Sequence, residues 1–164
     1  MIEIRKATRE DVPRILELVR ALAAYEREPD AAIATEEDFL RDGFGSAPAF
    51  HVHLATEDGV VVGFALWFFT WSTWRGRKCL HLEDLFVEPA HRKKGAGLAL
   101  MRALAEEAVA QGCARFIWQV LDWNEPSIAF YEKLGADVKR EWIAVRLDGA
   151  ALAALAGARD TLVE

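Results

Sequence analysis

The residues from Leu82 to Leu104 constrain the fold of this chain more than any other stretch. An apolar run through Val87 ends at Pro89, and a short basic turn that contains Gly95 and Gly97 follows it. Apolar residues then recur at helical spacing, at Leu98, Met101, Leu104, Ala105 and Ala108. The pattern predicts a strand, a turn and a helix in direct succession.

The turn has the features of an anion-binding site. The first N–H groups of a helix have no partner within the helix, and they carry the positive end of its dipole. Glycines let a ligand approach such a turn closely, and Arg92, Lys93 and Lys94 add positive charge beside it. The turn therefore predicts a phosphate site, although a basic helix start without any ligand fits the same residues.

Particular positions exclude two other phosphate loops. A dinucleotide-binding loop, G-x-G-x-x-G, needs a small residue at its last position, where this chain has Leu100. A Walker loop needs Gly-Lys followed by Ser or Thr, and this chain has no such sequence. What remains is the spacing R-x-x-G-x-G, formed by Arg92, Gly95 and Gly97 after a strand.

The N-terminal half of the chain predicts an edge strand, helices and a hairpin. Residues 2–5 alternate in polarity like a strand, and Thr8, with an acidic residue three positions later, caps a helix that ends near Tyr25. Thr35 caps a second, shorter helix. The pair Asp58-Gly59 predicts the hairpin. The strand-like runs of this region are residues 49–57, 60–71 and 78–87.

Shorter elements follow the central helix. Residues 115–121 are nearly all apolar and predict a strand that is buried on both faces. Asn124 is a good N-cap for a short helix that Gly135 ends. A last strand at residues 141–147 and an Ala/Leu-rich helix at residues 149–157 complete the order.

Length and composition fit one soluble domain over residues 1–164. Of the 164 residues, 52% are hydrophobic, which suffices for a single full core. The 20 basic and 26 acidic residues give a net charge of −6, which argues against nucleic acid or anionic membranes as partners and suits a cationic substrate. Cys79 and Cys113 lack metal-ligand spacing and are expected to be reduced thiols. The N-terminus has no signal-type apolar stretch, so we expect a cytoplasmic protein.

The order of elements over almost the whole chain resembles the fold of the GCN5-related N-acetyltransferases, the GNAT superfamily. These enzymes use the pattern R-x-x-G-x-G to hold the pyrophosphate of acetyl-coenzyme A. The segments that resemble the diamine (spermidine/spermine) and thialysine acetyltransferase branch are AYE at 24–26, LEDLFV at 82–87 and, above all, WNEPSIAFY at 123–131. The resemblance implies a single-domain α/β (α+β) fold, with a mixed, mostly antiparallel central sheet flanked by helices.

The resemblance also implies which residues bind acetyl-CoA, the co-substrate, and it implies no metal. Leu85, Phe86 and Val87 would present backbone groups to the pantetheine arm and the acetyl carbonyl, where their strand splays from its neighbour. The turn would cradle the pyrophosphate, and a segment after the next strand would contact the cofactor. The turn residues are Arg92, Lys93, Lys94, Gly95, Ala96, Gly97 and Leu98, and the later segment is Asn124, Glu125, Pro126 and Ser127.

Acetyl transfer to an amine requires a neutral amine, stabilisation of the developing oxyanion and a proton for the departing thiolate. A tyrosine can give that proton, because a phenol titrates at about 10, close to the range of a thiol. The resemblance implies that Tyr131 is this general acid, although a core aromatic between Ile128 and Leu134 fits the same spacing. A backbone N–H near Leu85 or Phe86 can meet the oxyanion.

An acidic pocket is expected for the amine, because an alkylamine is mostly charged at pH 7. Glu83 is the candidate for binding the cation and relaying its proton through water, and Glu26 and Asp84 would add negative potential. A solvated strand residue stays the alternative for Glu83, as an exposed charged loop does for Tyr25 and Glu26. The residues that the resemblance places in this pocket are Tyr25, Glu26, Glu83, Asp84, Ile117, Trp118 and Gln119.

The sequence therefore predicts an acetyl-CoA-dependent N-acetyltransferase that acts by direct transfer on a small amine, with di- or polyamines and thialysine-like amino acids as the first substrates to consider. The family also implies a homodimer. Lys93-Lys94 stands where the diamine branch often has Gly and an apolar residue, and KREW at 139–142 is more basic than a polyamine site requires. The alternatives are acetylation of a protein lysine or N-terminus, and a non-catalytic acyl-CoA-binding module.

Overall fold

The computed structural model describes residues 1–157 and divides into two compact units, Met1–Gln119 and the rest of the chain from Val120. The sheet of the first unit contains β1 (Ile2–Lys6), β2 (His51–Glu57), β3 (Val60–Ser72), β4 (Arg77–Val87) and β5 (Phe116–Trp118), in that spatial order. Its helices are α1 (Val12–Tyr25), α2 (Glu36–Gly43) and α3 (Ala96–Ala110), with short 3-10 turns at Arg9–Asp11, Pro29–Ala31 and Pro89–His91. A single domain over residues 1–164 stays a prediction.

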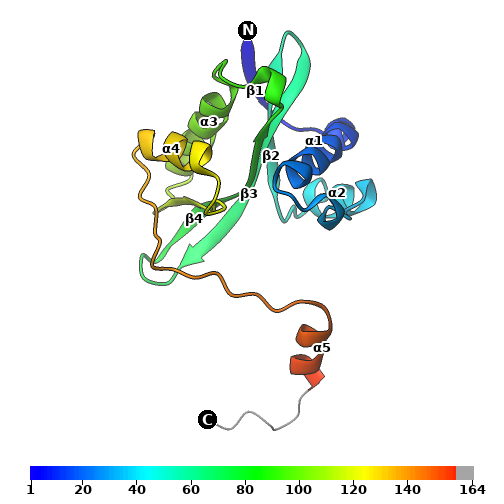
Figure 1. The fold of residues 1–164 in the computed structure, drawn as a ribbon, viewed down its shortest axis with the longest axis vertical. Coiled ribbons are helices and arrows are strands. Elements are labelled where there is room, and N and C mark those ends of the chain that lie inside the picture. The colour runs from blue at the N-terminus through cyan, green and yellow to red at the C-terminus, as the bar shows by residue number, and fades with distance from the viewer. Residues whose placement is uncertain (158–164) are drawn as a thin grey trace. The chain divides into compact units, whose positions relative to one another are not determined.

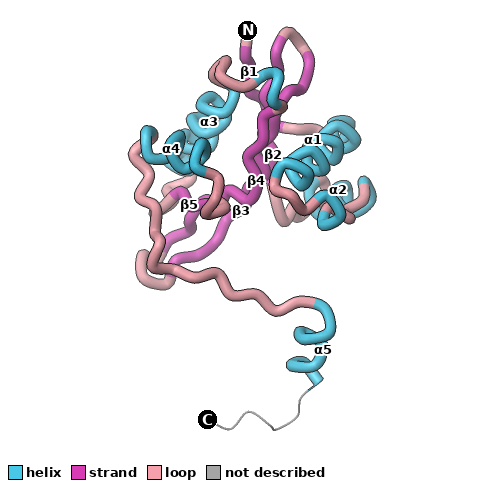
Figure 2. The backbone as a smooth tube through the Cα atoms, viewed as in Figure 1, coloured by secondary structure: helices cyan, strands magenta, loops and turns pink. Residues whose placement is uncertain are grey.

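The sheet is antiparallel except at one edge. Each of the strands β1 to β4 pairs with the next in antiparallel fashion, whereas β5 is parallel to β4. A parallel pair needs a crossover connection, and α3 provides it. Helices α1 and α2 lie on one face of the sheet and α3 lies on the other (Figure 1; Figure 2). The predicted mixed, mostly antiparallel sheet with flanking helices is confirmed.

Local signals placed most of these elements correctly. Asp58 and Gly59 both have positive φ, 52° and 84°, as a tight hairpin turn between β2 and β3 requires. Thr8 forms a capping box with Asp11, and Thr35 accepts a hydrogen bond from the backbone N–H of Asp38. The hairpin and the start of α2 are confirmed. The capping box at Thr8 instead starts the 3-10 turn Arg9–Asp11, and α1 begins directly after it at Val12.

The core of the first unit lies on both sides of the sheet. Ile15 and Leu18 of α1 are fully buried against Phe64 of β3 and its neighbours. On the other face, Leu100 and Leu104 of α3 are also fully buried. Each such side chain stabilises the fold by roughly 1.5–3 kcal/mol through the apolar surface that it removes from water. The rigid sheet that results carries the residues of the candidate site.

The second unit contains α4 (Glu125–Lys133) and α5 (Gly149–Gly157) in its described part. The Asn124 side chain caps α4 by accepting a hydrogen bond from the Ser127 N–H, and Gly135, with φ of 86°, follows the end of the helix. The predicted helix start at Asn124, the stop at Gly135 and the helix at 149–157 are therefore confirmed.

Two strand predictions were wrong. Residues 115–121 form only the three-residue strand β5, and Ile117 is 37% exposed, because β5 is the edge strand of the described sheet and lacks a second neighbour. Residues 141–147 form no strand, since no described strand pairs with them. Their apolar side chains Trp142, Ile143 and Val145 are 74%, 85% and 92% exposed.

Two further features of the described residues concern membrane-spanning helices and the cysteines. No helix within residues 1–157 combines the length and the apolar character that crossing a bilayer demands. Cys79 is buried in the sheet, Cys113 is half-buried, and both are free.

Candidate active site

A β-bulge in β4 sets the direction of the acidic side chains. In the β3–β4 ladder Leu66 pairs with Asp84, but the next residue, Trp67, pairs with Leu82, so Glu83 is the extra residue. Because a bulge shifts the alternation of side chains by one, Leu82 and Asp84 point to opposite faces of the sheet. Asp84 therefore shares the face of Leu66, which packs in the core with α1.

Three carboxylates gather around this bulge. Glu26 directly follows the last residue of α1, and Glu83 and Asp84 come from β4. Burial, and then the negative charges of Glu83 and Glu26, raise the pKa of Asp84 to about 6. Burial also raises the pKa of the half-buried Glu26. The structure thus brings together three of the residues that the sequence placed in the amine pocket.

His81 joins this group, although the sequence analysis did not place it in the site. Its Nε2 lies 3.4 Å from a carboxylate oxygen of Glu83, and its ring stacks against Phe68 at a centroid distance of 4.9 Å. The spacing of two residues between His81 and Glu83 on a strand was the signal that could have found it. Imidazole beside carboxylate gives the site a second group that can carry a proton.

Tyr25 and Arg92 connect α1 to the end of β4. The guanidinium carbon of Arg92 lies 4.7 Å from the centroid of the Tyr25 ring and 5.5 Å from that of Phe86. The Nε of Arg92 donates a hydrogen bond to the carbonyl oxygen of Val87 at 2.8 Å. Arg92 therefore holds three parts of the predicted site together, while its contact with phosphate stays a prediction.

The strands β4 and β5 separate next to the bulge. Their ladder runs only from Leu80 and Phe116 to Leu82 and Trp118, whereas β4 continues to Val87 with β3 as its one partner in the first unit. The β5-side edge at Leu85, Phe86 and Val87 consequently has no strand partner in the described part of the chain, which is the geometry that the expected cofactor contacts need. Ile117, Trp118 and Gln119 stand where the opening begins.

The turn before α3 has room and hydrogen-bond donors for an anion. Gly95 has φ of 94°, and the first helical hydrogen bond runs from the N–H of Ala99 to its carbonyl. The N–H groups of Ala96, Gly97 and Leu98 have no acceptor among the described residues. A Cβ added to Gly97 would meet no atom within 4 Å, so the surface there is open. These residues fit a pyrophosphate group.

The remaining predicted residues lie in the second unit. Asn124 is buried and caps α4, and Glu125, Pro126 and Ser127 form the first turn of that helix. Tyr131 is 8% exposed on the same helix as the buried Ile128, and its ring lies 5.3 Å from that of Phe130. The roles of these residues in cofactor binding and proton donation stay predictions.

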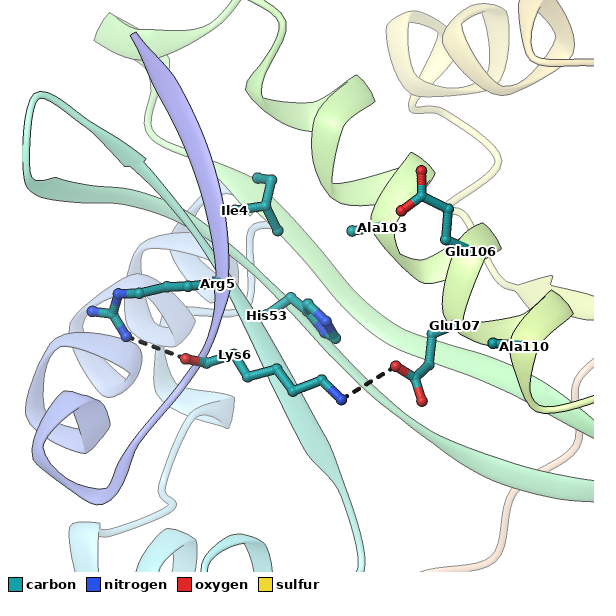
Figure 3. A pocket seen from close by; sticks show the side chains of 8 residues that line it. All are labelled: Ile4, Arg5, Lys6, His53, Ala103, Glu106, Glu107 and Ala110. Atoms are coloured by element: carbon teal, nitrogen blue, oxygen red, sulfur yellow. Dashed lines mark hydrogen bonds and ion pairs between the residues drawn. The ribbon is translucent and has the colours of Figure 1, made fainter.

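A separate open pocket lies between β1, β2 and α3 (Figure 3). His53 accepts a hydrogen bond at Nδ1 from the indole N–H of Trp67, and Lys6 pairs with Glu107 at 3.2 Å. Burial, and then the charge of Lys6, lower the pKa of His53, which is therefore neutral at pH 7. No group of three potential metal ligands occurs within the described part of the chain.

The chain is similar to known acetyltransferases over nearly its whole length. Residues 12–136 match the model of the acetyltransferase (GNAT) family. The chain is 37% identical to a thialysine N-epsilon-acetyltransferase of Bos taurus, across 95% of this chain and 98% of the bovine protein. It is 32% identical to an L-ornithine N5-acetyltransferase of Arabidopsis thaliana, across 93% of this chain and 86% of the plant protein.

A solved structure agrees with these relatives in fold. The integron cassette protein from the mobile metagenome of V. cholerae has a TM-score of 0.81 at 29% identity, covering 96% of this chain and 98% of its own. The overall fold of the chain is thus a known architecture. The chain is a member of the acetyltransferase (GNAT) family, in the branch that contains the thialysine and diamine acetyltransferases, and it is an N-acetyltransferase.

Proposed function

We propose that this protein transfers an acetyl group from acetyl-CoA directly to the primary amine of a small cationic substrate. The substrate class is a di- or polyamine or a thialysine-like amino acid. The observation that carries the proposal is the cluster of Glu26, Glu83 and Asp84 at the bulge, one residue away from the free edge of β4. The names of the thialysine and ornithine acetyltransferase relatives support an amine at the end of a short chain.

The three carboxylates suit a cation for a physical reason. Their charges repel one another, and this repulsion adds to the larger effect of burial in raising the pKa of Asp84 to about 6. A bound ammonium group relieves the repulsion and favours the ionised form of each carboxylate. A neutral or anionic substrate gives no such relief, so the cluster selects for positive charge.

The proton of the ammonium group must leave before the nitrogen can attack. We assign this transfer to Glu83, through water, with His81 at 3.4 Å as the next group in line. A free primary ammonium titrates at about 10.4, so its deprotonation is uphill at pH 7. The reaction should therefore run faster as the pH rises toward 9.

The chain's other residues hold the acyl donor and complete the transfer. Acetyl-CoA supplies the activated acetyl group as a thioester. The open turn from Lys93 to Leu98 holds the pyrophosphate, and a backbone N–H at Leu85 or Phe86 donates to the acetyl oxygen as negative charge develops on it. Tyr131 gives the proton to the departing thiolate.

We also propose a cytoplasmic homodimer. Residues 141–147 are mostly apolar and lack a strand partner among the described residues. Exposed side chains such as Trp142 and Val145 form an apolar surface that a second copy can cover. Sedimentation equilibrium on the full chain tests this, and a monomer at all concentrations contradicts it.

A thiol-release assay tests the reaction itself. Purified protein is mixed with acetyl-CoA and, in separate samples, thialysine, ornithine, putrescine, spermidine and a lysine-containing peptide. We expect release of coenzyme A and an acetylated product with at least one of the small amines. Release with the peptide alone indicates a protein acetyltransferase, and coenzyme A binding without release indicates a non-catalytic binding module.

A further inference from the structure

Glu57 at the end of β2 binds two residues of the turn before α3. The ammonium nitrogen of Lys94 lies 3.0 Å from both carboxylate oxygens of Glu57, and Nδ1 of His91 hydrogen-bonds to one of them. His91 and Lys94 stand on either side of Arg92 and Lys93. The part of the turn that precedes its glycines is thus attached to the β2–β3 hairpin on both sides of Arg92 and Lys93.

This contact is charged and partly shielded from water. The Glu57 side chain is 19% exposed, compared with 48% for Lys94. The hydrogen bonds from His91 and then from Lys94 lower the pKa of Glu57, so its carboxylate is ionised at neutral pH. The carboxylate therefore balances the charge of Lys94.

The adjacent Lys93 makes no such contact with a carboxylate among the described residues. It is exposed, and its ammonium group has no partner among the described residues. It also has a φ of 62°, in the left-handed region that favours glycine and strains the backbone of other residues. The chain keeps a charged side chain at a position where glycine would be easier to accommodate.

We infer that the two lysines have separate tasks: Lys93 contacts the phosphate groups of coenzyme A, and Lys94, held by Glu57, positions the turn. This inference rests on the proposed use of acetyl-CoA. Glu57 is accordingly a positioning residue, since it acts on the cofactor through the turn. If Lys94 instead leaves Glu57 to bind phosphate, a change at Glu57 frees Lys94 and should tighten the binding of coenzyme A.

Titration calorimetry with coenzyme A over a series of KCl concentrations separates the two arrangements. Lys93→Gly should weaken binding by about 10-fold, as expected for a charged hydrogen bond, and should reduce the salt dependence of the affinity. Glu57→Gln and Lys94→Met should each weaken binding by about 2- to 5-fold, as for an exposed ion pair, and leave the salt dependence unchanged. The double variant should be no weaker than either single variant.

The matched control is Asp58→Asn, which removes a neighbouring carboxylate whose ion pair among residues 1–157 is with the amino group of Met1. It should bind like the wild type. The inference is overturned if Glu57→Gln tightens binding, or if Lys94→Met reduces the salt dependence as strongly as Lys93→Gly does.

Amide hydrogen exchange of the ligand-free protein keeps this test separate from the proposed function. Glu57→Gln and Lys94→Met should speed exchange in residues 91–97, and Asp58→Asn should not. If the wild type fails to bind coenzyme A, the proposed function fails, whereas the positioning role of Glu57 is still decided by exchange. Unchanged exchange in Glu57→Gln overturns it.

Discussion

Gly63 of β3 lies so close to Phe86 of β4 that a Cβ added to the glycine would stand 2.7 Å from the Phe86 carbonyl oxygen. The contact is on the β3 side of the same stretch of β4 whose other edge lacks a pairing with β5, in the register where Gly63 pairs with Val87. Any side chain at position 63 must push the backbone of residues 85–87 away. The absence of a side chain at position 63 therefore allows the backbone of the expected acyl-binding edge to keep its position.

Gly63→Ala should reduce kcat by about 10-fold or more, because small displacements of positioning groups carry large penalties in rate. It should also destabilise the protein by about 1–3 kcal/mol, as overpacking does. Steady-state kinetics and urea unfolding measure the two effects. Gly157→Ala is the control, since a Cβ there meets nothing within 4 Å. Normal kinetics in the Gly63 variant would remove this edge from the mechanism.

Tyr131→Phe should lower turnover by roughly 100-fold or more with little change in the affinity for acetyl-CoA, because a general acid acts in the transition state. The ring that packs on α4 is retained in this variant, so the fold should be unaffected. Single-turnover kinetics together with calorimetry measure the two quantities. Turnover equal to the wild type rules out a role for the hydroxyl in proton donation.

Glu83→Gln should raise KM for cationic amines by about 10-fold, since it removes one of the three charges that attract the substrate. Its side chain is exposed, so stability should change little. Added KCl should raise the wild-type KM more than that of the variant. Glu36→Gln, which removes an exposed charge from α2, is the control. An unchanged KM counts against the assigned role of Glu83.

Asp84→Asn should stabilise the protein at pH 7 and have little effect at pH 3.5. The pKa of Asp84 is raised from 3.8 to about 6 in the folded protein, chiefly by burial. The folded state therefore holds the proton more tightly, and stability falls as the pH rises from below 4 to above 6. A shift of this size corresponds to about 3 kcal/mol. Thermal unfolding across this range measures it, and a pH-independent difference between variant and wild type contradicts the assignment.

How much the sequence could predict depended on whether the signal was local. The Asp58-Gly59 hairpin and the Asn124 cap were predicted because a few neighbouring residues determine their backbone conformation. The strand predicted at residues 141–147 was wrong, because a strand forms only with a partner, and the pattern of one segment does not reveal whether that partner exists.

In the candidate site, too, local motifs predict residue identities, whereas contacts between distant segments depend on the fold. The sequence motifs identified Glu83, Asp84 and Glu26 as site candidates. Their proximity depends on a β-bulge in β4, which no residue type in that strand predicts. The attachment of Lys94 to Glu57 joins segments that are far apart in the chain, so only the folded structure shows it.

The bulge in β4 has a consequence for how substrate preference can change. Glu83 is extra to the ladder, so deleting it would leave Leu82 opposite Trp67 and Asp84 opposite Leu66, and Asp84 would stay on the face of α1. The site would lose one carboxylate, while the side chains before and after it kept their faces. At this one position of the strand, a charge can be inserted or removed without turning any neighbouring side chain to the other side of the sheet.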